Sequence, residues 1–164
     1  MDEAAVLTDA FGRVSEVVHS AVDGLDEDEL ARRLDGRGNS IAWLIWHLTR
    51  VQDDHVADAF GEAQVWHDEW VEHFDLPFDG GDTGYGHNSD DVAAVRASAE
   101  LLLGYFDAVH GRTLALVGTL GTSDLDRIVD ENWDPPVTLG VRLISVISDD
   151  LQHAGQANYV RGLL

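Results

Sequence analysis

Four long segments of the chain carry apolar residues at three- and four-residue spacing, and this periodicity constrains the fold more than any other feature of the sequence. The segments cover about 2–22, about 39–60, about 88–120 and 138 to the C-terminus. Such spacing places apolar side chains on one face of an α-helix. We therefore predict an all-α fold in which four amphipathic helices pack their apolar faces together as a four-helix bundle.

Residues at the expected helix ends support these boundaries. Asp26 stands three residues before Glu29, which is the spacing of a capping box and predicts a short helix after the first long one. Gly61 and Gly121 follow the second and third long helices, at positions where glycine commonly ends a helix. Thr138 is placed to cap the last helix.

One long connection is expected between the second and third long helices. It contains a short helical piece at about 63–73 and then a loop over 76–88, which has one proline and four glycines. The helical pattern also breaks down over 122–136, and no segment alternates regularly enough to predict a sheet. A length of 164 residues is typical of one domain, so we expect a single domain over 1–164.

The charge of the chain excludes several kinds of partner. Asp and Glu number 31 against 10 Lys and Arg, which gives this acidic protein a formal net charge of −21. Nucleic acids and anionic membranes repel such a chain, so we expect neither as a partner. No apolar run is long enough to span a bilayer, and the N-terminus lacks the pattern of a signal peptide. The expected localisation is cytoplasmic.

Three residues on two of the predicted helices are candidate metal ligands. Asp149 and His153 are four residues apart on the last helix, so their side chains project to the same side and can share one ion. His47 lies on the second helix, at the flank of its apolar arc, as the other two do on theirs. If the two flanks face each other, the three residues form a His, His, Asp set that leaves coordination positions open for water or substrate.

The same residues have a simpler interpretation. Asp149 and His153 can form an ordinary charge pair on a solvated helix face, and His47 can be a histidine at the edge of the core with its nitrogens satisfied by neighbours. Spacing alone favours this second interpretation, because a chain with so many carboxylates produces such pairs by chance.

The side of the second helix that carries His47 also carries Trp43, Arg50 and Asp54. We predict that these three residues line a substrate pocket beside the metal. Arg50 has two interpretations: it holds a substrate carboxylate through a bidentate pair, or it forms a structural salt bridge with Asp53 or Asp54.

Other patterns are weaker. The first helix offers one Glu-x-x-His motif, Glu16 to His19, whereas di-iron bundles need this motif on two helices. Glu69 and His73 have ligand spacing, but a solvated amphipathic face explains them. The glycines over 80–86 lack the lysine of a phosphate-binding loop.

Together these features resemble the DinB-like superfamily of metal-binding four-helix bundles, especially the branch that includes mycothiol-dependent maleylpyruvate isomerase. The resemblance rests on Asn-Ser-Ile-Ala-Trp-Leu-Ile-Trp-His-Leu over 39–48 and on Asp149-x-x-x-His153-Ala-Gly-Gln, and it extends over most of the chain. It implies that His47, Asp149 and His153 bind a divalent metal. It also implies that the second and third helices run parallel and are joined by a long crossover connection over 61–88.

One residue departs from the family pattern. Many relatives carry His or Glu at the place of Asp149, and the shorter side chain implies either a metal nearer the last helix or an acid that acts through water.

The resemblance implies a metal-dependent enzyme of the low-molecular-weight-thiol transferase or isomerase type, acting on a small electrophilic substrate. Zinc or nickel is the expected cofactor, because imidazole suits both and the chain has no cysteine to supply a thiolate ligand. With no cysteine nucleophile, the attacking group is a metal-bound hydroxide or an exogenous thiol, and the resemblance favours a thiol cosubstrate such as mycothiol. The alternative, from another class, is a non-enzymatic bundle that binds metal or a small ligand in stress response. The sequence leaves open whether the chain forms a homodimer.

Overall fold

The computed structural model describes residues 2–164 and consists mainly of helices. The four long helices are α1 (Glu3–Val22), α3 (Ile41–Phe60), α6 (Ala99–Val117) and α7 (Leu139–Arg161). Helix α1 packs against α6 and α7, and α3 packs against the same two helices. This arrangement confirms the predicted all-α bundle.

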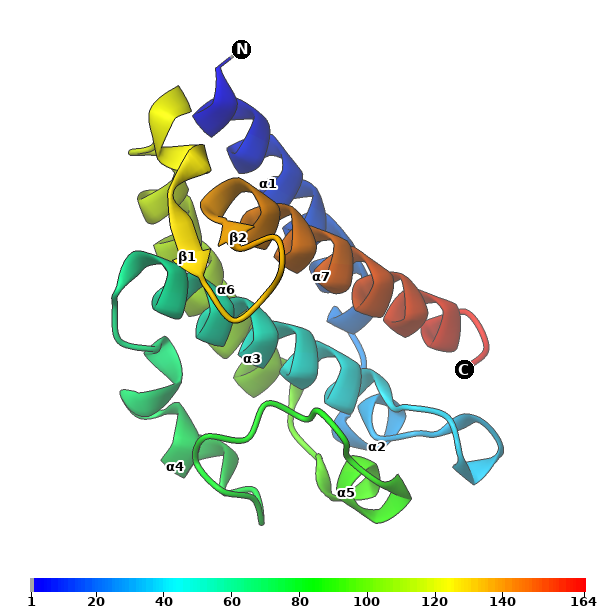
Figure 1. The fold of residues 1–164 in the computed structure, drawn as a ribbon. Coiled ribbons are helices and arrows are strands. Elements are labelled where there is room, and N and C mark those ends of the chain that lie inside the picture. The colour runs from blue at the N-terminus through cyan, green and yellow to red at the C-terminus, as the bar shows by residue number, and fades with distance from the viewer. Residues whose placement is uncertain (1) are drawn as a thin grey trace.

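The direction of the helices fixes the connectivity of the bundle. Figure 1 shows α3 and α6 running the same way, with α1 and α7 running in the opposite direction. Parallel neighbours need a connection that returns along the bundle, so the segment between α3 and α6 is the long crossover that the sequence predicts.

The predicted caps at Asp26, Ser40, Gly61 and Thr138 are present, whereas α6 ends at Val117, with Gly118 rather than Gly121 as its C-cap. Ser40 accepts a hydrogen bond from the backbone N–H of Trp43 (3.1 Å) at the start of α3, and Gly61 ends the helix in a left-handed conformation, with φ of 69°. Helix α2 (Glu27–Leu30) begins with a capping box in which Asp26 and Glu29 exchange two bonds of 2.9 Å. Each cap satisfies backbone donors that the first turn of a helix leaves free.

The predicted third helix is wrong in one respect, because it is two helices. Helix α5 (Ser89–Ala94) ends before α6, and the backbone of Val95 leaves helical geometry, with ψ of 99°. Ser98 then caps α6 through the N–H of Leu101 (3.1 Å). Both Val92 and Val95 are buried, so the apolar spacing continues across the break and hides it from periodicity.

The short elements around the bundle also differ in detail. The helical piece expected at 63–73 is a 3₁₀ turn, η2 (Val65–His67), followed by α4 (Trp70–Phe74). The remaining 3₁₀ turns are η1 (Leu34–Gly36) and η3 (Thr122–Asp126). Where no sheet was expected, strands β1 (Ile128–Asp130) and β2 (Val137–Thr138) pair antiparallel in a small hairpin before α7. Strands of three and two residues are too short for alternation to reveal them.

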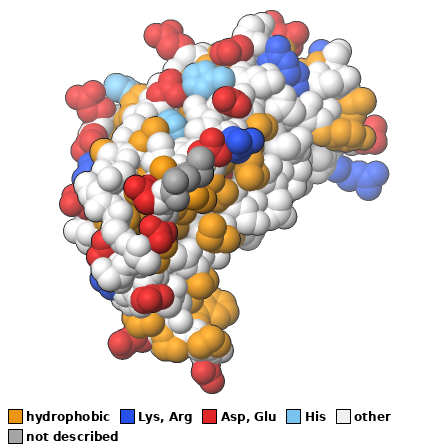
Figure 2. All heavy atoms as spheres, turned by 90° about the horizontal axis from the view of Figure 1, so that it is seen from above, with side chains coloured by type: hydrophobic (Ala, Val, Ile, Leu, Met, Phe, Trp, Pro, Cys, Tyr) orange, Lys and Arg blue, Asp and Glu red, His pale blue; other side chains and the backbone are white. Residues whose placement is uncertain are grey.

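The surface carries the excess acid. Figure 2 shows Asp and Glu side chains spread over one face of the molecule with few basic ones between them. Within residues 2–164, no helix combines the length and the apolar character that crossing a membrane requires.

Candidate metal centre

The structure brings His47, Asp149 and His153 together where α3 packs against α7. One ligand atom from each residue lies within 4.8 Å of the other two. The imidazole centroids of His47 and His153 are 4.8 Å apart, and Nε2 of His153 lies 3.7 Å from Oδ1 of Asp149. The last distance is too long for a hydrogen bond but within ion-pair range, so it agrees with the charge pair of the alternative interpretation as well as with a shared ion.

Hydrogen bonds leave the Nε2 atom of both histidines free to bind an ion. Nδ1–H of His47 donates to the backbone carbonyl of Thr83 (2.5 Å), and Nδ1–H of His153 donates to Oε1 of Gln156 (3.3 Å). A neutral imidazole carries one proton, so each Nε2 has an unshared electron pair. Burial lowers the pKa of His47, which keeps its ring neutral.

The acid of the cluster has an uncommitted atom. Oδ2 of Asp149 is buried and has no hydrogen-bond partner among residues 2–164. The neighbouring Asp150 is fully buried, and burial raises its pKa well above the usual range, with Asp149 as the second cause. Two imidazole nitrogens and an unpartnered carboxylate oxygen are a donor set that suits zinc or nickel.

The loop over 76–88 holds His47 in place. Gly84 lies against the ring with φ of +95°, and a Cβ atom added there would lie 2.7 Å from Nδ1 of His47. Oδ1 of Asp82 accepts from the backbone N–H of Gly84 (2.7 Å) and fixes the turn. Only glycine fits this position, because the backbone conformation and the close approach both exclude a side chain.

Trp43 lies beside the cluster but is not among the residues that line the adjoining cavity. Its ring stacks on His47 with centroids 4.6 Å apart and planes inclined by 15°. Its indole N–H donates to Nδ1 of His87 (3.0 Å), and Nε2 of His87 donates to Oδ2 of Asp82 (3.1 Å). Nothing in the sequence pointed to His87, which comes from the loop rather than from a helix.

Arg50 is buried in the core, with an exposed fraction of 0%. Its Nε–H donates to the backbone carbonyl of Asp82 (3.1 Å), and its Nη1 donates to Oε1 of Gln64 (2.9 Å). The guanidinium lies over the ring of Trp66, 4.8 Å from the centroid, and 3.8 Å from a carboxylate oxygen of Asp53. These contacts agree with the structural salt bridge, and the guanidinium has no exposed surface.

Asp54 also lies away from a substrate site. Its Oδ1 accepts from Nε2 of Gln64 (2.7 Å), and it is not among the residues that line the cavity beside the cluster. None of the three residues expected to line a pocket lines this cavity, although Trp43 stacks on His47.

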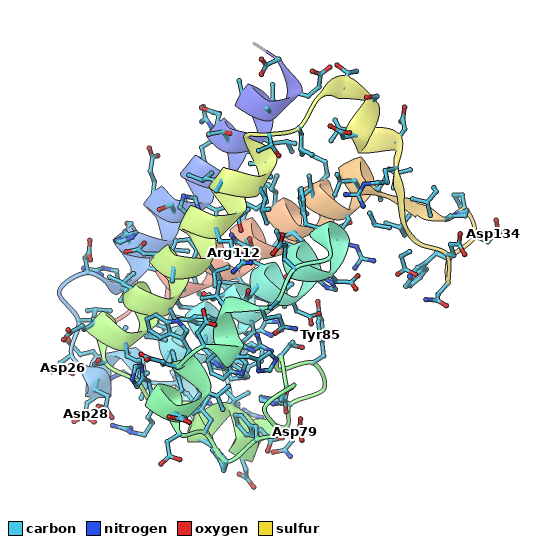
Figure 3. All side chains as sticks on the ribbon, turned by 90° about the vertical axis from the view of Figure 1, so that its left-hand side faces the viewer. Asp26, Asp28, Asp79, Tyr85, Arg112 and Asp134 are labelled. Atoms are coloured by element: carbon cyan, nitrogen blue, oxygen red, sulfur yellow. The ribbon has the colours of Figure 1, made fainter. Side chains whose placement is uncertain are left out.

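An open cavity of about 340 Å³ adjoins the cluster at Asp149 and extends along α3 and α7 to the hairpin. Tyr85 stands at its edge, packed edge-on against His47 with centroids 5.3 Å apart. Tyr85 lies beside α3, as Figure 3 shows. Asp134, in the loop of the hairpin, lies on the same side of the molecule.

Sequence reasoning missed several polar residues of this cavity, among them His55 and Arg142. A signal for His55 was present, because His47, Val51 and His55 follow one another at four-residue spacing and share one face of α3.

The chain matches a family model and several solved structures. A family model described as Mycothiol-S-transferase matches residues 6–164. A crystal structure described as a conserved protein of Enterococcus faecalis has a TM-score of 0.90 and 28% sequence identity to this chain. That match covers 98% of this chain and 96% of the other. No curated protein matches the chain.

Proposed function

The chain belongs to the mycothiol-S-transferase family, a DinB-like family, and on that premise we propose that it transfers a low-molecular-weight thiol to a small electrophilic substrate with the help of a divalent metal. Mycothiol is the thiol that the family description suggests. His47, Asp149 and His153 are the proposed metal ligands, and zinc or nickel is the proposed metal.

The cluster of these three residues carries the proposal. Both histidines offer a deprotonated Nε2, Asp149 offers an oxygen that no protein group binds, and the cluster borders an open cavity. When bound, a divalent ion favours the thiolate form of a coordinated thiol at neutral pH. The chain has no cysteine of its own, so an outside thiol is the source of sulfur.

The protein residues position the reactants. The bond to Thr83 and the stacked ring of Trp43 fix the orientation of His47, so its Nε2 keeps one direction. The cavity beside Asp149 has apolar walls that include Val51 and Val146, which suit an apolar electrophile and exclude water from part of its surface.

Metal titration of the purified chain tests the ligand set. We expect one divalent ion per chain, with affinity reduced more than about tenfold in His47→Ala and His153→Ala, since each loses a ligand. His67→Ala is the matched control, because His67 is exposed and lies outside the cluster. Unchanged affinity in both ligand variants would reject the site.

A second assay tests the reaction. Metal-loaded protein, stripped protein and His153→Ala are compared in the conjugation of 1-chloro-2,4-dinitrobenzene with mycothiol, glutathione and cysteine. We expect turnover only with metal and a thiol. Metal-dependent hydrolysis without a thiol would replace the transferase proposal by a hydrolase, and metal binding without any turnover would favour the non-enzymatic binding protein.

A further inference from the structure

The cavity has a second polar end, away from the metal cluster, at His55. His55 lies eight residues after His47 on the same face of α3, a separation of about 12 Å along the helix axis. It lines the same cavity as Asp149. A ligand that reaches from one end to the other passes Val51 of α3 and Val146 of α7.

Arg142 fixes the tautomer of His55. Nη1 of Arg142 lies 2.8 Å from Nδ1 of His55, and a guanidinium only donates hydrogen bonds. Nδ1 is therefore the acceptor, and the proton of the neutral ring is on Nε2. Burial lowers the pKa of His55, as does the charge of Arg142, so the ring is neutral near pH 7.

The hairpin in turn holds Arg142. Its Nη2 donates to Oδ2 of Asp130 on β1 (2.9 Å), while Oδ1 of Asp130 accepts from the backbone N–H of Asn132 (2.9 Å). Both terminal nitrogens of Arg142 therefore have protein partners. Nε2–H of His55 has no hydrogen-bond partner among residues 2–164, which leaves it as the free donor at this end of the cavity.

The charges and walls of the cavity indicate what this donor contacts. Arg142 is the one Lys or Arg side chain among the lining residues of the described chain, and Asp130 neutralises it. The rim carries two aromatic side chains that are largely exposed, Tyr85 at 63% and Trp133 at 66%. Exposed rings beside apolar walls suit a planar apolar group, and a neutral N–H suits an uncharged oxygen.

We propose that Nε2–H of His55 is a specificity-determining contact that binds an uncharged acceptor oxygen on a planar, apolar electrophile in this cavity. The proposal rests on the proposed function, because it names the class of electrophile that the proposed transferase reaction would use. Arg142 and Asp130 act as positioning residues that keep the proton of His55 on Nε2.

Binding of an unreactive probe tests this contact without any turnover. Methyl 3,5-dinitrobenzoate is uncharged and carries acceptor oxygens, and without a thiol in the sample it is not conjugated. Its affinity for the metal-loaded chain is measured by NMR titration of the wild type, His55→Phe and His55→Gln. We expect the Phe variant to bind about five- to tenfold more weakly, as the loss of one neutral hydrogen bond predicts. The Gln variant retains a side-chain N–H and is expected to bind within about twofold of the wild type.

Two controls separate the contact from general damage. His67→Phe makes the same substitution at an exposed histidine outside the cavity and is expected to leave binding unchanged. Long-range ¹H–¹⁵N spectra report the tautomer directly, and we expect the Nε2–H form of His55 in the wild type and a mixture of tautomers in Arg142→Gln.

Several results would overturn the proposal. Equal binding in the wild type and His55→Phe, or no binding of the probe to the cavity, would show that His55 does not form the proposed contact. An Nδ1–H tautomer of His55 would show that Nε2 has no proton to donate to the probe. Tighter binding of 3,5-dinitrobenzoate than of the ester, lost in Arg142→Gln, would assign recognition to Arg142. Because no thiol or turnover enters these measurements, a failed conjugation assay leaves their outcome readable.

Discussion

Replacing Gly84 by alanine tests whether the loop over 76–88 holds His47, the proposed metal ligand. Gly84 has φ of +95°, and a Cβ atom there would lie 2.7 Å from Nδ1 of His47 and 3.1 Å from the ring of Trp46. A positive φ costs an alanine about 1–2 kcal/mol, and overpacking of a buried site costs about 1–3 kcal/mol more. We expect Gly84→Ala to lower the free energy of unfolding by about 3 kcal/mol, or the Tm by roughly 6–12 °C.

Metal affinity is the more specific readout of this substitution. The added methyl group displaces the ring of His47 from the carbonyl of Thr83, and loss of such a supporting bond typically weakens metal binding about 10–100-fold. Stability is measured by urea denaturation of the stripped protein, because bound metal would itself shift the unfolding equilibrium. Affinity is measured by isothermal titration with zinc.

The same loop provides a matched control. Gly86 also has a positive φ, of 79°, but a Cβ atom added there meets nothing within 4 Å. Gly86→Ala therefore carries the backbone strain without the clash, and we expect a cost of about 1–2 kcal/mol with unchanged metal affinity. If the two variants bind zinc equally well, the loop does not position His47 and the reasoning fails.

Two further substitutions test buried charges near the cluster. Arg50→Lys is expected to lower the free energy of unfolding by about 2–4 kcal/mol, because lysine cannot replace the bonds to Gln64 and Asp82 together. Binding of the probe in the cavity is expected to stay unchanged. Weaker probe binding with intact stability would instead support the substrate-binding role of Arg50. Asp150→Asn is expected to raise the Tm more at pH 8 than at pH 5. Burial raises the pKa of Asp150 in the folded state, so the wild type loses stability as pH rises above the ordinary value of about 3.9. Equal shifts of Tm at both pH values would contradict this sign.

The local features of the fold could be predicted from the sequence, because their causes lie within a few residues. Apolar spacing marks the four long helices, and the caps at Asp26, Ser40 and Thr138 each act on a backbone N–H three residues away. The sequence did not predict the break between α5 and α6, because the apolar spacing continues across it. Val92 and Val95 are both buried, and a pattern of burial does not record whether the backbone between them stays helical.

Arg50 shows what helical periodicity leaves out. The helical arc correctly places Arg50 on the side of α3 that carries His47. The loop over 76–88 then covers this side, and its Asp82 and Thr83 carbonyls bind Arg50 and His47 respectively. A residue on the flank of the helix thereby becomes a core residue. The path of an irregular loop depends on contacts distant in sequence, so no local pattern could place it.

The pairing of His47 with Asp149 and His153 has the same non-local origin, and spacing alone favoured the simpler interpretation. The resemblance to the DinB-like superfamily supplied the pairing, since a family fold fixes which helices are neighbours. The structure adds the reason that these side chains stay available: Thr83 and Gln156 occupy the Nδ1 atoms of the two histidines and leave each Nε2 free.

The contact between α3 and α7 therefore has opposite polarity at its two ends. At one end, the Nε2 atoms of His47 and His153 and the free Oδ2 of Asp149 all offer electron pairs, a donor set that suits a cation. At the other end, His55 offers only an N–H, because Arg142 occupies its Nδ1. Oδ2 of Asp149 is buried without a hydrogen-bond partner, and leaving such an atom unpaired costs stability, so a ligand is expected to complete the end at Asp149. Under the proposed function, the ligand is then oriented with its thiol partner at the cluster of His47, Asp149 and His153 and its acceptor oxygen at His55.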